Sequence, residues 1–313
     1  MSRRWVGIDE AGYGPSLGPL VMTAVVATSD GDRPLDIWTD LAATVARAGG
    51  DPNALWVDDS KAIYKAGTGR DRLETTCLAA AAELSAGVPP KTFGGLLAAL
   101  GAGTLDEVEL SPWLDSGDPL LTERPLSHPR PFAGAPWRIE TIRSVVVGPS
   151  RFNAGLGRHG SKAKVHFEAF TTLLLDVWSR AGDGLVTQVR GDKHGGRHYY
   201  HEPLVNVFPD AWIDRGPEGP ALSSYTVRES GRRLELSLAP RADAGDGLVA
   251  LASVVSKAVR EYWMDAFNIH WAARIPGLRP TAGYPVDALR FRREIEPHCE
   301  RRGLDPSEWW RTK

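Results

Sequence analysis

The sequence alternates between short apolar runs of β-forming residues and longer stretches with apolar positions at helical spacing. Runs bounded by glycine, proline or polar turn residues predict strands, at residues 5–9, 20–27, 139–147, 184–191, 211–215, 222–228 and 234–238. Stretches with helical periodicity predict helices, at residues 71–84, 166–181, 247–267 and 286–302. A Ser-Gly pair between the last two strands predicts a hairpin turn.

This order of elements predicts an α/β fold with a mixed central sheet, helices on both of its faces and a helical C-terminal subdomain. We expect a main domain over residues 1–265 and the helical subdomain over residues 266–313. Residues 87–136 are rich in proline, glycine and tryptophan. We expect them to form an insertion or a lid-like unit with short helical pieces.

Composition narrows the class of protein without choosing an activity. With 313 residues, of which 42% are hydrophobic, the chain is long enough for one large core and a smaller unit. The chain has no apolar run long enough to span a membrane and no secretory signal pattern at its N-terminus, so we expect a cytoplasmic protein. Cys77 and Cys299 are expected to be free thiols there, and neither has a second cysteine at zinc-ligand spacing.

The formal net charge of −2 does not mark a nucleic-acid-binding protein. It does not exclude one, because a carboxylate cluster lowers the net charge while a basic rim binds phosphates locally. Arg158, His159, Lys162 and Lys164 form a candidate rim, although a basic run is more often a solvated face.

Four acidic residues occupy positions that suit a metal site. Asp9 and Glu10 follow an apolar strand directly, and neighbouring side chains there should point to opposite sides. Asp192 ends another predicted strand, and Asp243 precedes the long helix at 247–267. Taken singly, each has an ordinary structural interpretation as a turn cap, a solvated acid or a helix N-terminal acid. Together they are what a two-metal nuclease needs to bind Mg²⁺, but periodicity does not show that they converge.

Six further polar residues have both functional and structural interpretations. The serines and lysines can orient a phosphate or an acid, or lie in surface turns and on solvated helix faces. The histidines follow Asp192 and can assist proton transfer. A spacing of four residues places Ser253 and Lys257 on one helix face. The six are Ser60, Lys61, His194, His198, Ser253 and Lys257.

Several segments resemble one protein family. GIDEAGYGPSLGPL resembles the opening of ribonuclease HII, and residues 241–261 are similar, without a gap, to the segment that carries the family's last catalytic aspartate and the following helix. VDDSK (57–61) and TAGYPVD (281–287) are shorter and support the resemblance by their order. Asn153 matches an asparagine commonly seen before a helix in the family. The resemblance covers most of the chain, except the region near 87–136.

The resemblance implies a ribonuclease H-like fold in which Asp9, Glu10, Asp192 and Asp243 are catalytic and bind two Mg²⁺ or Mn²⁺ ions. Asp246 competes for the role of Asp243, but the ungapped match favours Asp243. The implied activity is endonucleolytic hydrolysis of the RNA strand of an RNA/DNA hybrid. The implied partner is such a hybrid, or duplex DNA that contains a ribonucleotide, bound by a monomer.

The resemblance also implies a set of substrate-binding residues. Gly12, Tyr13 and Gly14 would contact the 2′-hydroxyl that distinguishes RNA from DNA, and Tyr284, in the C-terminal subdomain, would lie against the ribose or base at the RNA–DNA junction. The other implied contacts are Ser60, Lys61, Asn153, Ser253 and Lys257.

The sequence departs from the family at Tyr13, where arginine or lysine is usual. A phosphate contact is lost, so cleavage at a single embedded ribonucleotide becomes an open question. The chain begins at the catalytic strand, and we therefore expect no counterpart of the extra N-terminal domain typical of ribonuclease HIII.

Two other functions remain open. One is a hybrid-binding protein that keeps the fold without cutting, although a binder gains nothing from a cluster of negative charge beside phosphates. The other is a nuclease of the same fold that acts on another nucleic-acid structure, which Tyr13 and the region 87–136 motivate.

Overall fold

The structure, a computed structural model, describes residues 2–65, 68–102, 112–114 and 130–312. Within these residues, the centre of the molecule is a seven-stranded sheet with the strand order β5-β2-β1-β6-β9-β8-β7. Its strands are β1 (Arg3–Ala11), β2 (Leu20–Ser29), β5 (Trp137–Val147), β6 (Val186–Asp192), β7 (Trp212–Glu218), β8 (Ser223–Glu229) and β9 (Arg232–Ala239). A separate parallel pair is formed by β3 (Val45–Ala46) and β4 (Leu55–Trp56).

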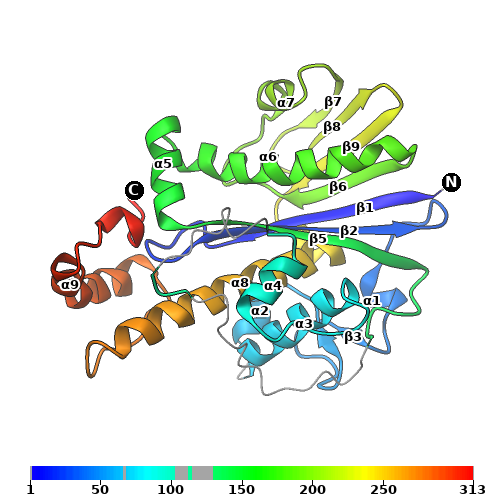
Figure 1. Cartoon of the computed structure of the whole chain (residues 1–313). Helices are drawn as coiled ribbons and strands as arrows, with labels where there is room; N and C mark the ends of the chain where they lie inside the picture. The colour runs from blue at the N-terminus through cyan, green and yellow to red at the C-terminus, as the bar shows by residue number, and fades with distance from the viewer. Residues whose placement is uncertain (1, 66–67, 103–111, 115–129, 313) are drawn as a thin grey trace.

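Helices pack on both faces of the sheet, as Figure 1 shows. The longer helices are α3 (Gly69–Glu83), α5 (Pro149–His159), α6 (Lys162–Arg180), α8 (Gly247–Ala272) and α9 (Pro285–Arg301). The shorter ones are α1 (Ile37–Asp40), α2 (Ser60–Lys65), α4 (Phe93–Ala99) and α7 (His201–Val207), with the 3-10 turns η1 (Ala181–Asp183), η2 (Ala242–Ala244) and η3 (Pro306–Glu308). The expected fold class, a mixed sheet flanked by helices, is confirmed.

The direction of the strands fixes where their ends meet. β1 is parallel to β6, and β6 is parallel to β9. β2 and β5 continue the sheet on one side with antiparallel pairing, and β8 and β7 do so on the other. The carboxyl ends of β1, β6 and β9 therefore lie next to one another at a single edge of the sheet.

Alternation along β1 sends its side chains to two different cores. Trp5 belongs to the core shared with α8, whereas Val6 and Ile8 belong to the core shared with α6. In Figure 1, α6 lies along one face of the sheet and α8 along the other. Because side chains alternate across a strand, Asp9 and Glu10 at the end of β1 must also point to opposite faces.

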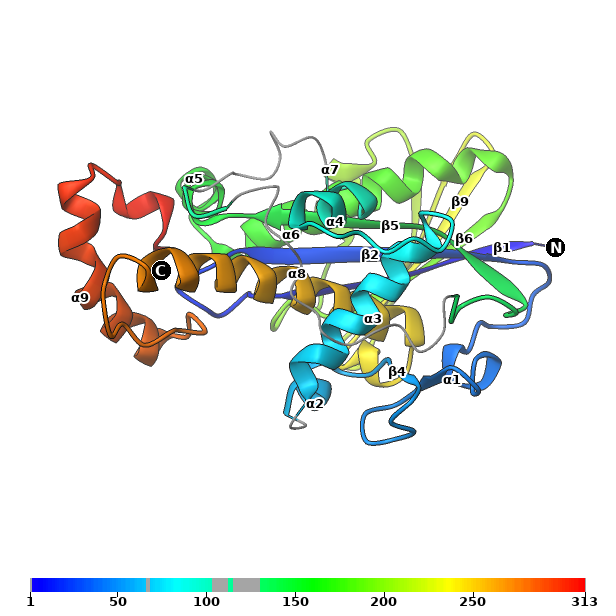
Figure 2. The ribbon, with the colours of Figure 1, turned by 60° about the horizontal axis from the view of Figure 1, so that its bottom comes forward.

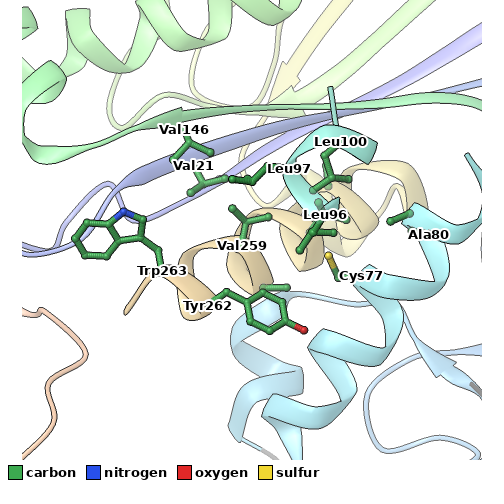
Figure 3. Close-up of a cluster of buried hydrophobic side chains, with 14 of the residues drawn as sticks. Val21, Cys77, Ala80, Leu96, Leu97, Leu100, Val146, Val259, Tyr262 and Trp263 are labelled. Carbon is green, nitrogen blue, oxygen red and sulfur yellow. The ribbon is translucent and has the colours of Figure 1, made fainter. Parts of the chain in front are cut away.

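The larger core lies between the sheet and a layer made by α3, α4 and α8 (Figure 3). Within the region 87–136, Phe93, Leu96 and Leu97 of α4 are buried in this core. The described part of that region therefore contributes to the main core. The rest of the region, residues 103–111 and 115–129, lies outside the described residues.

The C-terminal part of the chain continues from the main body without a break. α8 runs past residue 265 as one helix to Ala272, so the chain shows no break at the expected boundary. Phe291 of α9 and Trp309 are buried in the same core cluster as the sheet residues. Figure 2 shows α9 and the final segment gathered at one end of α8, on the side where α5 lies.

The predicted strands and the four predicted helices all occur, with ends shifted by a few residues. The predicted hairpin joins β8 to β9, with both Ser230 and Gly231 at positive φ. Cys77 and Cys299 are buried and unbridged. Among the described residues, no helix has the length and apolar composition that crossing a membrane requires.

Candidate active site

Asp9 and Glu10 end β1 on opposite faces of the sheet. Asp9 is 8% exposed and lies on the α8 side, where its carboxyl is hydrogen-bonded with Ser253 and its backbone oxygen accepts the hydroxyl of Ser256 at 3.1 Å. Glu10 lies on the α6 side, where its Oε2 is 3.4 Å from Nε2 of His166. The two carboxylates at the end of β1 thus lie on opposite faces of the sheet. The sequence predicted this arrangement from the alternation of side chains along a strand.

Asp192 ends β6, the parallel neighbour of β1. Its Oδ1 accepts the backbone N–H groups of Lys193 and Arg241, both at 2.8 Å. The second of these bonds ties the end of β6 to the turn that follows β9. Asp192 is therefore fixed at the edge where β1 also ends.

Asp243 lies in η2, the short turn that joins β9 to α8. Asp246, three residues later, caps α8 by accepting the N–H groups of Leu248 and Val249, and it also pairs with Arg190 at 3.0 Å. These contacts distinguish the surroundings of the two aspartates. Asp246 is held as a helix cap, while Asp243 remains available at the acidic edge.

Burial and neighbouring acids shift the pKa values of Asp9, Asp192 and Asp243. Burial and then the charge of Glu10 raise the pKa of Asp9 well above its usual value, and Asp243 adds to this. Burial raises the pKa of Asp192, with Glu10 contributing, and burial raises the pKa of Asp243, with Asp192 contributing. Like charges raise carboxyl pKa values only at short range. The structure thus brings together acids that come from three strand ends.

Residues near the start of α2 border this cluster. Ser60 is buried, and its hydroxyl lies 3.1 Å from that of Ser253, which contacts Asp9. Lys61 lowers the pKa of Asp243, and Asp59 raises it. Asp59, which stands inside the VDDSK segment and was not among the predicted site residues, is thus a further acid near Asp243.

The donor set suits a hard divalent cation. Among the described residues, no group of three or more His, Cys, Asp or Glu side chains is close enough to hold a metal ion as it stands. The cluster nevertheless offers only carboxylate oxygens, the ligands that Mg²⁺ and Mn²⁺ prefer. Asp9 is also buried beside other acids, a charge arrangement that a bound cation would relieve.

The Gly12–Gly14 loop follows directly after the acids. Gly12 has a φ of 91°, and a Cβ at this position would lie 2.3 Å from the backbone oxygen of Pro19, so only glycine fits. The ring of Tyr13 packs edge-on against His166, with 5.1 Å between ring centroids. Gly14 is exposed and has open space around its α-carbon.

The other substrate-binding candidates lie in different surroundings. Lys257 forms an ion pair with Glu261 and lies 4.8 Å from the ring of Tyr64. Tyr284 is the N-cap residue that precedes α9 and is 51% exposed. Asn153 has a structural role, because its amide donates to Ser307 and Trp310 carbonyls and accepts from Thr312.

The histidines and the basic run also differ in their contacts. His194 is buried against His166, Phe170 and Tyr200, and burial holds its pKa well below the usual range. It therefore supports the core behind Glu10. In the basic run, Arg158 and His159 both pair with Glu168. His166, which contacts Glu10, was not among the predicted site residues because no local motif marks it.

Some solved protein structures are similar to this chain, at low sequence identity. No protein-family model matches the sequence, and no curated protein matches it. A chain from the structure of the PCNA:RNase HII complex of Archaeoglobus fulgidus is similar, with 16% identity and a TM-score of 0.48 over 99% of this chain and 94% of that one. The ribonuclease H2 of Pyrococcus horikoshii OT3 is also similar, with 16% identity and a TM-score of 0.46. The match covers 98% of this chain and 92% of that one.

A third similar structure is Bst-RNase HIII in complex with Mn²⁺, with 15% identity and a TM-score of 0.48. This chain is covered to 99% and that chain to 66%. At such identities and TM-scores the likeness carries no conclusion about activity. What the chain does must be inferred from its own residues.

Proposed function

We propose that this protein hydrolyses the RNA strand of RNA/DNA hybrids as an endonuclease that depends on Mg²⁺ or Mn²⁺. The observation that supports this most is the placement of Asp9, Glu10, Asp192 and Asp243 at one sheet edge, where burial and neighbouring acids raise the pKa values of Asp9, Asp192 and Asp243. A glycine-rich loop next to the acids offers backbone groups to a substrate, which a merely structural acidic cluster would not need.

In this proposal, the four carboxylates hold the ions and the surrounding residues hold the carboxylates. Two divalent ions bound there would activate water and stabilise the departing oxygen, leaving a 3′-hydroxyl and a 5′-phosphate. Ser253 fixes Asp9, the Lys193 and Arg241 amides fix Asp192, and His166 contacts Glu10. Tyr284 is exposed enough to pack against a ribose or a base.

Separate substitutions of Asp243 and Asp246 should affect different properties, cleavage activity in one variant and stability in the other. Asp243→Ala is expected to lower hybrid cleavage on the order of 10²-fold by removing an ion ligand. Asp246→Ala is expected to cost about 1 kcal/mol of folding free energy through the lost helix cap while cleavage persists. Urea unfolding and initial cleavage rates measure the two effects. If Asp246→Ala lost cleavage while Asp243→Ala kept it, the choice of Asp243 as the ion ligand would be contradicted.

Replacing Tyr13 with arginine should change the preference between substrates. A guanidinium there restores a phosphate contact, so cleavage at a single embedded ribonucleotide should rise about tenfold relative to cleavage of a continuous hybrid. Tyr13→Phe keeps the ring packed on His166 and serves as the control, with no expected change. An unaltered ratio in Tyr13→Arg would show that position 13 does not contact the phosphate.

A further inference from the structure

The loop from Gly12 to Leu17 has its carbonyl oxygens bound on the inside by two buried arginines. Arg311 donates from Nη2 to the oxygens of Gly12 at 2.7 Å and Tyr13 at 3.3 Å, and from Nε to that of Pro15 at 3.0 Å. Its own backbone N–H donates to Ser16 at 2.9 Å. The guanidinium of Arg260 donates to the oxygen of Leu17 at 3.2 Å.

Several N–H groups of the same loop, in contrast to its carbonyls, have no hydrogen-bond partner within the described part of the chain. Ser16 and Leu17 donate to the oxygen of Gly283, but the N–H groups of Gly12, Tyr13 and Gly14 have no acceptor within the described part of the chain. The carbonyls of Gly12, Tyr13, Pro15, Ser16 and Leu17 are therefore hydrogen-bonded on the inner side of the loop, whereas three successive N–H groups have no acceptor among the described residues. Successive free backbone N–H groups are suited to bind an oxygen ligand.

Arg311 is unusual in its burial. It is 1% exposed and has no carboxylate partner among the described residues, and its guanidinium lies 4.4 Å from the centre of the Phe152 ring. Burial and then the charge of Arg260 lower the pKa of Arg311. Burying an unpaired charge costs free energy. Here the hydrogen bonds from the Arg311 guanidinium to the loop carbonyls offset that cost. If position 311 only had to fill space, an apolar side chain would do so with a lower free-energy cost of burial.

We propose that Arg311, together with Arg260, is a positioning residue for substrate selection: it holds the loop carbonyls inward so that the N–H groups of Gly12, Tyr13 and Gly14 face the 2′-hydroxyl of the RNA strand. This inference rests on the proposed function, because it assigns the loop to the ribose of that substrate. It adds a residue 296 positions away from Pro15 in the sequence to the part of the site that distinguishes RNA from DNA.

The test compares binding of two duplexes of one sequence, an RNA/DNA hybrid and a DNA/DNA duplex, by fluorescence anisotropy in Ca²⁺. The ratio of the two dissociation constants measures recognition of the 2′-hydroxyl. In Arg311→Met this preference should fall about tenfold, since the hydrogen bonds to the hydroxyl are lost. Arg311→Lys should retain part of it, because an ammonium can still reach some of the carbonyls.

Arg4→Met is the matched control. Arg4 is a buried arginine, 3% exposed, that pairs with Glu140 and Asp183 near the opposite end of β1. This variant loses stability but should keep the full preference for the hybrid. If Arg311→Met or Arg311→Lys folds and keeps the wild-type ratio, the proposal is wrong.

Failure of the proposed function gives a different result. If the wild-type protein itself shows no preference for the hybrid, the loop does not read the hydroxyl, and both proposals are overturned. If the wild type prefers the hybrid but all arginine variants do so equally, only the positioning role fails. Should Arg311→Met not fold, Arg311→Lys still gives the ratio, and amide hydrogen exchange of residues 11–17 reports whether its loop has been released.

Discussion

Replacing Asp9 with asparagine is expected to abolish metal-dependent cleavage of an RNA/DNA hybrid, with a loss on the order of 10³-fold or more. Asp9 is the most buried of the four acids, and its carboxyl is linked by charge to both Glu10 and Asp243. Asparagine has nearly the same shape but cannot carry the negative charge that holds a cation. Initial rates in Mg²⁺ and in Mn²⁺ measure the loss.

The same variant should be at least as stable as the wild type when no metal is bound. The pKa of Asp9 is raised in the folded state, by burial and then by Glu10. An acid of this kind destabilises the fold at neutral pH, and the penalty disappears as the pH falls below its unfolded-state pKa. A neutral asparagine removes the penalty, so the urea midpoint in EDTA should stay level or rise. A lower midpoint together with lost cleavage would mean that Asp9 supports the fold and not the chemistry.

Replacing Gly7 with alanine is expected to destabilise the protein by about 3 kcal/mol or more, the upper range for overpacking a core. A Cβ at Gly7 would lie 2.2 Å from the backbone carbon of Leu248 and 2.3 Å from the nitrogen of Val249. Both are backbone atoms in the first turn of α8, so the helix itself would have to move. Urea unfolding measures the change.

Gly157→Ala is the control for this effect. Gly157 lies within α5, and a Cβ there would meet nothing within 4 Å. This substitution should stabilise the helix by up to about 1 kcal/mol, because alanine has the higher helix propensity. If Gly7→Ala unfolds at the wild-type urea concentration, α8 does not need its close contact with β1.

The regular elements could be predicted because their patterns are local. Alternation in β1 and helical spacing in α8 follow from side-chain periodicity, and they place Asp9 and Asp243 at element ends. The convergence of the acids could not be predicted in this way. It depends on β1, β6 and β9 being parallel neighbours in the sheet, which no single segment encodes.

Contacts between distant segments were missed for the same reason. His166 lies beside Glu10, and Arg311 binds the Gly12–Pro15 carbonyls, yet neither stands in a motif. Asn153 shows the converse. The resemblance implied a substrate contact for Asn153, and no local pattern showed that its side-chain amide donates to the carbonyls of Ser307 and Trp310. The composition of residues 87–136 suggested an insertion or a lid-like unit, and did not show that Phe93 and Leu96 would lie in the core.

The most direct test of the central claim is cleavage of an end-labelled RNA/DNA hybrid by the wild-type protein, with Mg²⁺, with Mn²⁺ and with EDTA. The acidic cluster predicts cuts within the RNA strand that require the divalent ion and leave 3′-hydroxyl and 5′-phosphate ends, with the matching DNA/DNA duplex intact. A folded protein that cuts the hybrid with neither ion, or equally well in EDTA, would contradict the assignment of Asp9, Glu10, Asp192 and Asp243 as a metal-dependent nuclease site.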